Sequence, residues 1–139
     1  MYVVIMGCGR VGARLANLLV GAGHEVMVID ANESALSRLG SDFAGQTMVG
    51  DGIDMDDLRK AGLERADAFA AVTQGDNRNI MASQIAKHIF NVQRVVTRIY
   101  DPIRTDTYRT LGLDAISPTV IGAKVFYTTL TGEESQENV

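Results

Sequence analysis

The stretch Tyr2-Val3-Val4-Ile5-Met6-Gly7-Cys8-Gly9-Arg10-Val11-Gly12 decides the fold of this 139-residue chain. Its first five residues are continuously apolar, which is typical of a strand buried on both faces of a parallel sheet. The three glycines follow in the spacing G-x-G-x-x-G. In this spacing the first glycine permits a tight turn, the second lets a pyrophosphate approach the backbone, and the third lets a helix pack closely on the strand. The stretch therefore predicts the phosphate-binding turn of a βαβ unit.

The residues after the glycine loop complete that unit. Apolar residues recur at helical spacing over residues 11–19, Leu18 among them, and a second apolar strand over residues 25–30 ends at Asp30. Asp30 stands 18 residues after Gly12 (30 − 12 = 18), close to the ~20 residues expected for an acid that binds an adenosine ribose. The pattern predicts a dinucleotide or mononucleotide site. The alternative is a tight glycine turn without a ligand.

The rest of the chain continues to alternate helical segments with strands. Further strands are predicted over residues 46–49, 67–72, 94–99 and 115–116. The alternation predicts an α/β protein with a doubly wound Rossmann fold: a six-stranded parallel sheet in the order 3-2-1-4-5-6, helices on both faces, and a ligand crevice between strands 1 and 4. We expect this domain to span residues 1–130 and a polar C-terminal tail to occupy residues 131–139.

Composition narrows the class of protein. Apolar residues make up 46% of the chain and charged residues 22%, which is typical of a globular domain with its own core. The net charge is −4 without a basic block, so nucleic acid is not an expected partner. The apolar runs are far shorter than the ~20 residues of a membrane span, so direct membrane insertion is not expected. The single cysteine excludes an internal disulfide, and these features together indicate a cytoplasmic protein.

The ligand crevice of this fold is lined by residues that follow the strand ends. The amides of Gly9, Arg10 and Val11 are expected to face a phosphate at the helix N-terminus. Asp30 is expected to accept hydrogen bonds from ribose hydroxyls and to repel a 2′-phosphate, which disfavours NADP. The predicted cofactor-binding residues are Gly7, Cys8, Gly9, Arg10, Val11, Gly12, Asp30, Ala31, Asn32, Asp51, Gly52, Ile53, Thr73, Gln74, Gly75 and Arg98.

Three of these residues have competing interpretations. Asp51 is placed to read an adenine amino group or a ribose, but between two glycines it is equally a turn residue. Arg10 could hold a terminal phosphate through two hydrogen bonds, and the alternative is an exposed arginine. Cys8 is expected to fill space in the loop, because no histidine lies near it in sequence to activate a nucleophile. No catalytic residue and no metal site is predicted, because neither histidine has a metal-like partner spacing.

Nearly the whole length of the chain is used by the predicted nucleotide fold. A dehydrogenase also needs a second half or domain that places a substrate against the nicotinamide, and groups that move protons. The crevice therefore fits a sensor better than an enzyme. The alternative is a small NAD-dependent oxidoreductase, which turnover of NADH with carbonyl substrates would reveal.

The chain resembles the N-terminal domain of TrkA-type proteins, also called the KTN or RCK N-terminal domain, which are cytoplasmic regulators of potassium channels and transporters. The resemblance covers almost the whole chain in the family's order. It rests on Gly7–Gly12, Val28-Ile29-Asp30, Val49-Gly50-Asp51, Ala61-Gly62-Leu63, Ala66-Asp67-Ala68, Ala71-Val72-Thr73, Asn79, Leu111-Gly112-Leu113-Asp114 and Ile116-Ser117-Pro118-Thr119.

The resemblance implies that NAD(H), ATP, ADP or AMP binds at the glycine loop, with Arg10 near the phosphates and Asp30 and Asp51 near the adenosine. It also implies a homodimer within a higher gating ring, and a membrane potassium channel or transporter subunit as the partner that holds the chain peripherally at the inner membrane. Tyr100 departs from the family, which usually has asparagine in this Arg-x-Asn-Asp-Pro-like stretch. The family's C-terminal ligand-binding domain is missing, so either the chain is cut or the natural protein is a short form that partners another subunit.

The last predicted helix is apolar on most of its sides. After Thr119, the only polar side chains up to residue 130 are Lys124, Thr128 and Thr129. The apolar positions therefore spread well beyond a single stripe of the helix. A second subunit is the expected cover, in a two-fold contact anchored by Phe126 and Tyr127. The alternative is a helix packed wholly on its own sheet.

Overall fold

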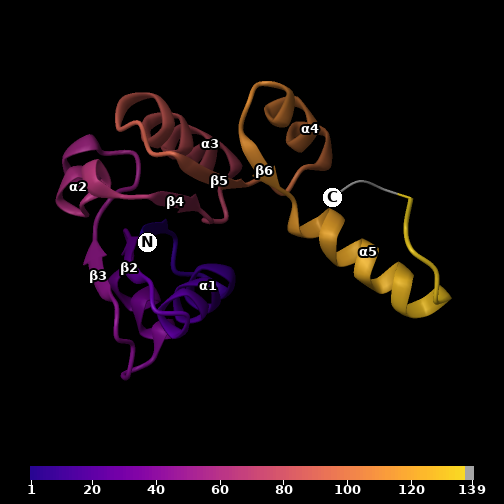
Figure 1. The fold of residues 1–139 in the computed structure, drawn as a ribbon, viewed down its shortest axis with the longest axis horizontal. Coiled ribbons are helices and arrows are strands. Elements are labelled where there is room, and N and C mark those ends of the chain that lie inside the picture. Colours follow the sequence, from indigo (N-terminus) through magenta and orange to yellow (C-terminus); the bar gives the residue numbers. More distant parts are fainter. Residues whose placement is uncertain (137–139) are drawn as a thin grey trace.

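A computed structural model describes residues 1–136 and confirms the predicted topology (Figure 1). Six parallel strands form one sheet in the order β3-β2-β1-β4-β5-β6. The order reverses between β1 and β4, which is where a doubly wound sheet opens a crevice at the carboxyl ends of its strands. The strands are β1 (Tyr2–Met6), β2 (Glu25–Asp30), β3 (Gln46–Val49), β4 (Ala68–Ala71), β5 (Arg94–Arg98) and β6 (Asp114–Ile116).

Helices make the crossovers between the strands. They are α1 (Arg10–Gly21), η1 (Glu33–Leu39), α2 (Met55–Lys60), η2 (Leu63–Arg65), α3 (Asp76–Gln84), η3 (Ile85–Ile89), α4 (Pro102–Thr110) and α5 (Pro118–Thr131). Of these, η1 and η2 are 3₁₀-helices and η3 is a π-helical turn that continues α3. Side-chain oxygens of Asn32, Asp54, Asp101 and Ser117 accept backbone N–H groups at the starts of η1, α2, α4 and α5, where the first turn has no internal acceptors.

The core lies on both faces of the sheet. Alternate residues of β1 point to opposite faces: Val3 and Ile5 pack beneath α1 and η1, whereas Val4 and Met6 pack beneath α2 and α3. Figure 1 shows α1 on the opposite side of the sheet from α2 and α3. Because every residue of β1 is buried, the continuous apolar run of this strand is explained.

The helix predicted from the apolar residues over 11–19 is confirmed, but those residues make only part of its contact with the sheet. The residues that α1 buries are small, namely Gly12, Ala13 and Ala16, so the helix axis lies close to the sheet. Leu15 packs at the edge of this contact, while Leu18 is 64% exposed. Helical spacing alone could not show that small residues make the contact.

The last helix does not return to the sheet. Figure 1 shows α5 extending away from the strands, and none of its residues is buried; Phe126 is 73% exposed and Leu130 84%. On the α1 side of the sheet, an apolar groove of about 390 Å³ stays open, lined by residues that include Val72, Val96 and Pro118. The alternative in which α5 packs wholly on its own sheet is therefore wrong.

The domain boundary predicted at residue 130 falls one residue before the end of α5 at Thr131. Gly132 follows in the left-handed conformation, with φ 74°, which commonly ends a helix. Of the polar tail predicted over residues 131–139, residues 137–139 lie outside the described part. Within residues 1–136, no helix combines the length and the apolar character needed to cross a bilayer.

Candidate functional site

The candidate site lies where the loops after β1 and β4 meet. Gly7, with φ 109°, directly follows β1 and lies against the loop after β4. A Cβ at this position would lie 2.9 Å from the backbone nitrogen of Thr73. A crevice of about 690 Å³ opens beside this contact. Its volume is within the range of small-molecule sites, and its position is the one that the strand order dictates.

The glycine loop presents an open helix N-terminus to the crevice. A Cβ on Gly12 would lie 1.9 Å from the carbonyl oxygen of Gly7, so only glycine lets α1 begin this close to the loop. A Cβ on Gly9 would meet nothing within 4 Å, which leaves space for a ligand against the backbone. The first N–H groups of α1 have no partner inside the helix, and with the helix dipole they favour an anion such as a phosphate.

Asp30 ties the end of β2 to the glycine loop. One carboxylate oxygen accepts the backbone N–H of Cys8 at 2.7 Å, and the other accepts the N–H of Asn32 at 2.8 Å. These bonds fix the orientation of the carboxylate toward the crevice that it lines. Each oxygen keeps a further lone pair, so Asp30 can accept hydrogen bonds from a ribose while it holds the loop.

Asn79 holds the opposite wall of the crevice together. This fully buried side chain accepts the N–H of Thr73 at 3.0 Å and donates to the carbonyl oxygens of Thr73 and Arg98 at 2.9 and 3.0 Å. The loop after β4 and the end of β5 are therefore joined through one amide. A buried group with all of these bonds made is a rigid support, and it holds the backbone of Thr73 and Arg98, whose side chains line the crevice.

The crevice carries an excess of positive charge although the whole chain is acidic, with a net charge of −4. Its ionisable lining comprises the guanidinium groups of Arg10, Arg38 and Arg98 and the carboxylate of Asp30. Arg38 reaches from η1 and donates to the carbonyl oxygen of Cys8 at 3.2 Å. Arginine binds phosphate oxygens through paired, charge-assisted hydrogen bonds, so the lining suits a ligand with several negative charges.

Cys8 is a structural residue of the loop. Its side chain is fully buried, and burial first, then the charge of Asp30, raises the pKa of its thiol, while Arg38 opposes the rise. A thiol with a raised pKa keeps its proton near neutral pH and is a poor nucleophile. The geometry thus agrees with the interpretation that Cys8 fills space.

The structure brings most of the predicted site residues together. Those that line the crevice are Gly7, Cys8, Gly9, Arg10, Val11, Asp30, Asn32, Thr73, Gln74 and Arg98. Those that do not line it are Gly12, Ala31, Asp51, Gly52, Ile53 and Gly75. For Gly12 the reason is the close contact with Gly7, which is a packing role.

Asp51 has a partner of its own outside the crevice. Its carboxylate accepts a hydrogen bond from Arg78 at 2.5 Å in an exposed ion pair, and it also accepts the N–H of Ile53 at 3.1 Å. Position 52 has no room for a side chain beside Met6, because a Cβ there would lie 1.7 Å from the Met6 sulfur. The turn interpretation explains the geometry of these residues, and a role in reading adenine stays a prediction.

Sequence reasoning missed four lining residues: Ala35, Arg38, Val72 and Tyr100. Ala35 and Arg38 lie on η1, where a 3₁₀-helix gives no clear periodic signal. Val72 directly precedes the predicted Thr73. Tyr100 follows Arg98 after one buried residue, and the alternation of side chains near the end of a strand could have found it.

A family model of the TrkA-N domain matches residues 3–118. The chain belongs to the TrkA-N family. One relative is the Trk system potassium uptake protein TrkA of Streptomyces coelicolor, which is 50% identical over 117 residues. This segment makes up 84% of the present chain and 52% of the relative, so the chain spans about half the length of that protein.

Solved structures with the same fold include two of the protein GsuK. The crystal structure of GsuK bound to ADP is 26% identical, with a TM-score of 0.80 over 96% of this chain and 34% of that chain. The GsuK channel bound to NAD is 26% identical, with a TM-score of 0.79 over 93% of this chain and 23% of that chain. The match to the TrkA-N family runs from residue 3 to Pro118, the first residue of α5, so the crevice and all of the strands except Tyr2 lie inside the matched segment.

Proposed function

We propose that this chain is the nucleotide-sensing part of a cytoplasmic potassium-transport regulator, and that it binds an adenine nucleotide rather than catalysing a reaction. The observation that carries the proposal is the crevice of a TrkA-N chain in which an open helix N-terminus, Asp30 and three arginines meet. Phosphates suit the helix N-terminus and the arginines. A ribose suits the carboxylate of Asp30.

The proposed ligands are NAD(H), ATP, ADP and AMP. The ADP and NAD bound to GsuK support this class of ligand. The negative charge of Asp30 at the ribose position disfavours the 2′-phosphate of NADP. The carboxylate of Asp51 binds Arg78 and the N–H of Ile53 through the same oxygen, so its other oxygen can accept a hydrogen bond from the adenosine.

The proposed assembly is a homodimer held by α5. The open groove and the exposed apolar side chains of α5 are two uncovered apolar surfaces of one chain, and Pro118 both lines the groove and begins the helix. A second copy related by a two-fold axis can lay its α5 across the groove and receive the first copy's α5 in return. Phe126 and Tyr127 would anchor this contact.

The transport role is proposed for a larger assembly. Such dimers would form a gating ring on the cytoplasmic side of a membrane potassium channel or transporter subunit. The name of the S. coelicolor relative, a potassium uptake protein, supports this partner, as does the GsuK channel.

The test of nucleotide binding is calorimetry on ligand-free protein with AMP, ADP, ATP, NAD⁺, NADH and NADPH. We expect saturable binding of adenine nucleotides and weaker binding of NADPH than of NADH. Absence of binding for all of them at millimolar concentration would overturn the proposal. Turnover of NADH with a panel of carbonyl substrates would replace it with the oxidoreductase alternative.

A pair of glycine variants controls for the site. Gly9→Asp places a carboxylate where the phosphate is proposed, at a position where an added Cβ meets nothing and φ is not positive. Gly21→Asp makes the same change in equally open space at the far end of α1. We expect both variants to fold, the first to lose nucleotide binding through repulsion of the phosphate, and the second to keep it.

A further inference from the structure

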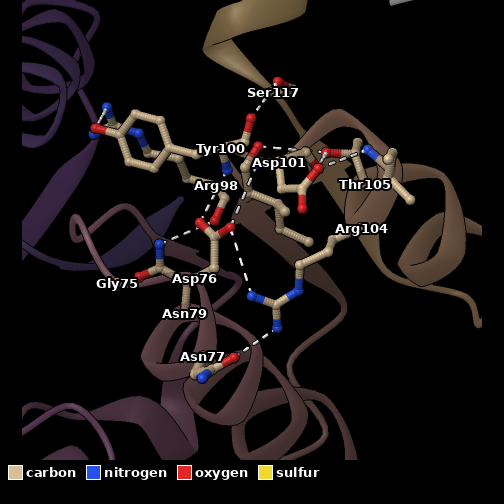
Figure 2. A network of polar contacts seen from close by, with 12 residues as sticks. Gly75, Asp76, Asn77, Asn79, Arg98, Tyr100, Asp101, Arg104, Thr105 and Ser117 are labelled. Carbon is tan, nitrogen blue, oxygen red and sulfur yellow. Dashed lines mark hydrogen bonds and ion pairs between the residues drawn. The ribbon is translucent and has the colours of Figure 1, made fainter.

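Arg98 and Tyr100 form a stacked pair on the β5 side of the crevice. The guanidinium carbon of Arg98 lies 4.2 Å from the centre of the Tyr100 ring, and one terminal nitrogen donates to the Tyr100 hydroxyl. The other terminal nitrogen lies 3.5 Å from the carbonyl oxygen of Val72. Figure 2 shows the two side chains lying together, away from the polar contacts around Asp76. Both side chains line the crevice.

The guanidinium of Arg98 is not fully satisfied. Its Nε is buried and has no hydrogen-bond acceptor within residues 1–136. A buried donor without an acceptor costs free energy, and a cation costs more than a neutral group. The negative charge of an anion in the crevice would stabilise this guanidinium cation.

The backbone beneath the pair is held in place from several sides (Figure 2). The carboxylate of Asp76 accepts the N–H groups of Tyr100 at 2.9 Å and of Asp101 at 3.4 Å. The carbonyl of Tyr100 accepts the Ser117 hydroxyl at 3.4 Å. The backbone of residue 100 is therefore held in place, and the contact with Arg98 orients the ring in the crevice before any ligand arrives.

Strand order places this pair opposite Asp30. Asp30 ends β2 and Arg98 ends β5, with the glycine loop after β1 and the Thr73 loop after β4 between them. A nucleotide whose ribose is at Asp30 and whose first phosphate is at the glycine loop extends toward Arg98 and Tyr100. What lies beyond the first phosphate therefore meets a guanidinium and a phenol.

We infer that Arg98 and Tyr100 recognise the outermost phosphate of a nucleoside diphosphate or triphosphate, so that the crevice selects ADP and ATP over NAD⁺. This inference rests on the proposed function. A terminal phosphate accepts charge-assisted hydrogen bonds from Arg98 and a further bond from the Tyr100 hydroxyl. The oxidised nicotinamide ring is a cation, and beside Arg98 it is repelled. Tyr100, which is 36% exposed, thereby contributes to the choice between these nucleotides.

The test compares dissociation constants for AMP, ADP, ATP and NAD⁺ in the wild type, Tyr100→Phe, Tyr100→Asn and Arg98→Gln. We expect the wild type to bind ADP and ATP more tightly than NAD⁺. Tyr100→Phe and Tyr100→Asn should weaken ADP and ATP by about threefold to tenfold, and Arg98→Gln by about tenfold to a hundredfold. AMP should change little in all three variants, and Arg98→Gln should not weaken NAD⁺.

Tyr108→Phe is the matched control, because Tyr108 packs on the core beneath α4 and does not line the crevice; all four affinities should be retained. Wild-type protein that binds NAD⁺ more tightly than ADP would overturn the inference. The inference would also be overturned if the variants are folded, as judged by their thermal unfolding, and keep the wild-type ratios of the dissociation constants for ATP and AMP and for ATP and NAD⁺. If the wild type binds none of the four nucleotides, the proposed function is refuted. This result differs from binding without the expected preference, which refutes only the inference about Arg98 and Tyr100.

Discussion

Replacing Asp30 with alanine should weaken nucleotide binding and also loosen the glycine loop. The carboxylate is the acceptor for the N–H of Cys8 at 2.7 Å and of Asn32 at 2.8 Å, and a ribose is expected to share its oxygens. Losing hydrogen bonds to a charged group costs about 1.5–3 kcal/mol. This loss corresponds to about a 10-fold to 150-fold weaker affinity for every adenosine ligand.

The stability effect comes from the backbone. Cys8 is fully buried, so its N–H loses an acceptor that water does not readily replace, at a cost of about 1–3 kcal/mol. Asn32 is exposed and its N–H can turn to solvent. For a domain of this size the expected loss lowers Tm by about 3–12 °C, measured by calorimetric unfolding of the ligand-free protein.

The matched control is Asp67→Ala. Asp67 accepts the N–H of Tyr2 at 2.8 Å, which is the same kind of bond at the opposite end of β1, outside the crevice. This variant should lose stability and keep its nucleotide affinity. If Asp30→Ala left the affinities for AMP, ADP, ATP, NAD⁺ and NADH unchanged, the ribose role would be refuted; an unchanged Tm would refute the role in holding the loop.

Three further predictions follow from the crevice and from α5. Arg10→Ala should weaken ATP more than AMP in calorimetry, while Arg14→Ala, outside the crevice lining, should change neither; equal losses for ATP and AMP would limit Arg10 to the first phosphate. Because burial raises the pKa of the Cys8 thiol, the unfolded chain loses this proton first, so wild-type stability in urea should fall as pH rises above about 8.5, the ordinary pKa of cysteine. Cys8→Ala should show a smaller fall, and an identical pH dependence would contradict the assignment. Phe126→Asp should convert the dimer to monomer in sedimentation at tens of micromolar, while Thr128→Asp, about 200° around the helix, should stay dimeric; a wild type that sediments as a monomer would exclude the dimer.

Local patterns explain why so much of the fold could be predicted. A parallel strand covered on both faces is apolar without interruption, as β1 is, and the glycine spacing after it restricts the backbone to few shapes. Asp30 is placed by the same logic, because a residue at the end of β2 must lie at the carboxyl edge of the sheet. These features depend on neighbours in sequence.

The missed features depend on partners that lie far away in sequence. Asp51 has the same local sequence whether it faces a ligand or Arg78, which lies 27 residues later. Arg38 reaches Cys8 across 30 residues, and nothing near it in sequence indicates that it enters the crevice. For α5, the apolar composition predicts that the helix needs a cover, but the direction of the helix is set by how the chain leaves β6.

Ser117 gives α5 and the crevice a hydrogen-bonding atom in common. Its buried hydroxyl accepts the N–H of Val120 at 3.3 Å, which caps α5, and donates to the carbonyl of Tyr100 at 3.4 Å. A displacement of Tyr100 is therefore also a displacement of the cap. If the proposed dimer and the proposed nucleotide binding both hold, thermodynamic linkage works in both directions: by whatever factor a nucleotide changes the dissociation constant of the dimer, dimerisation changes that of the nucleotide by the same factor. Nucleotide affinity measured at several protein concentrations thus reads out the coupling without any transporter present.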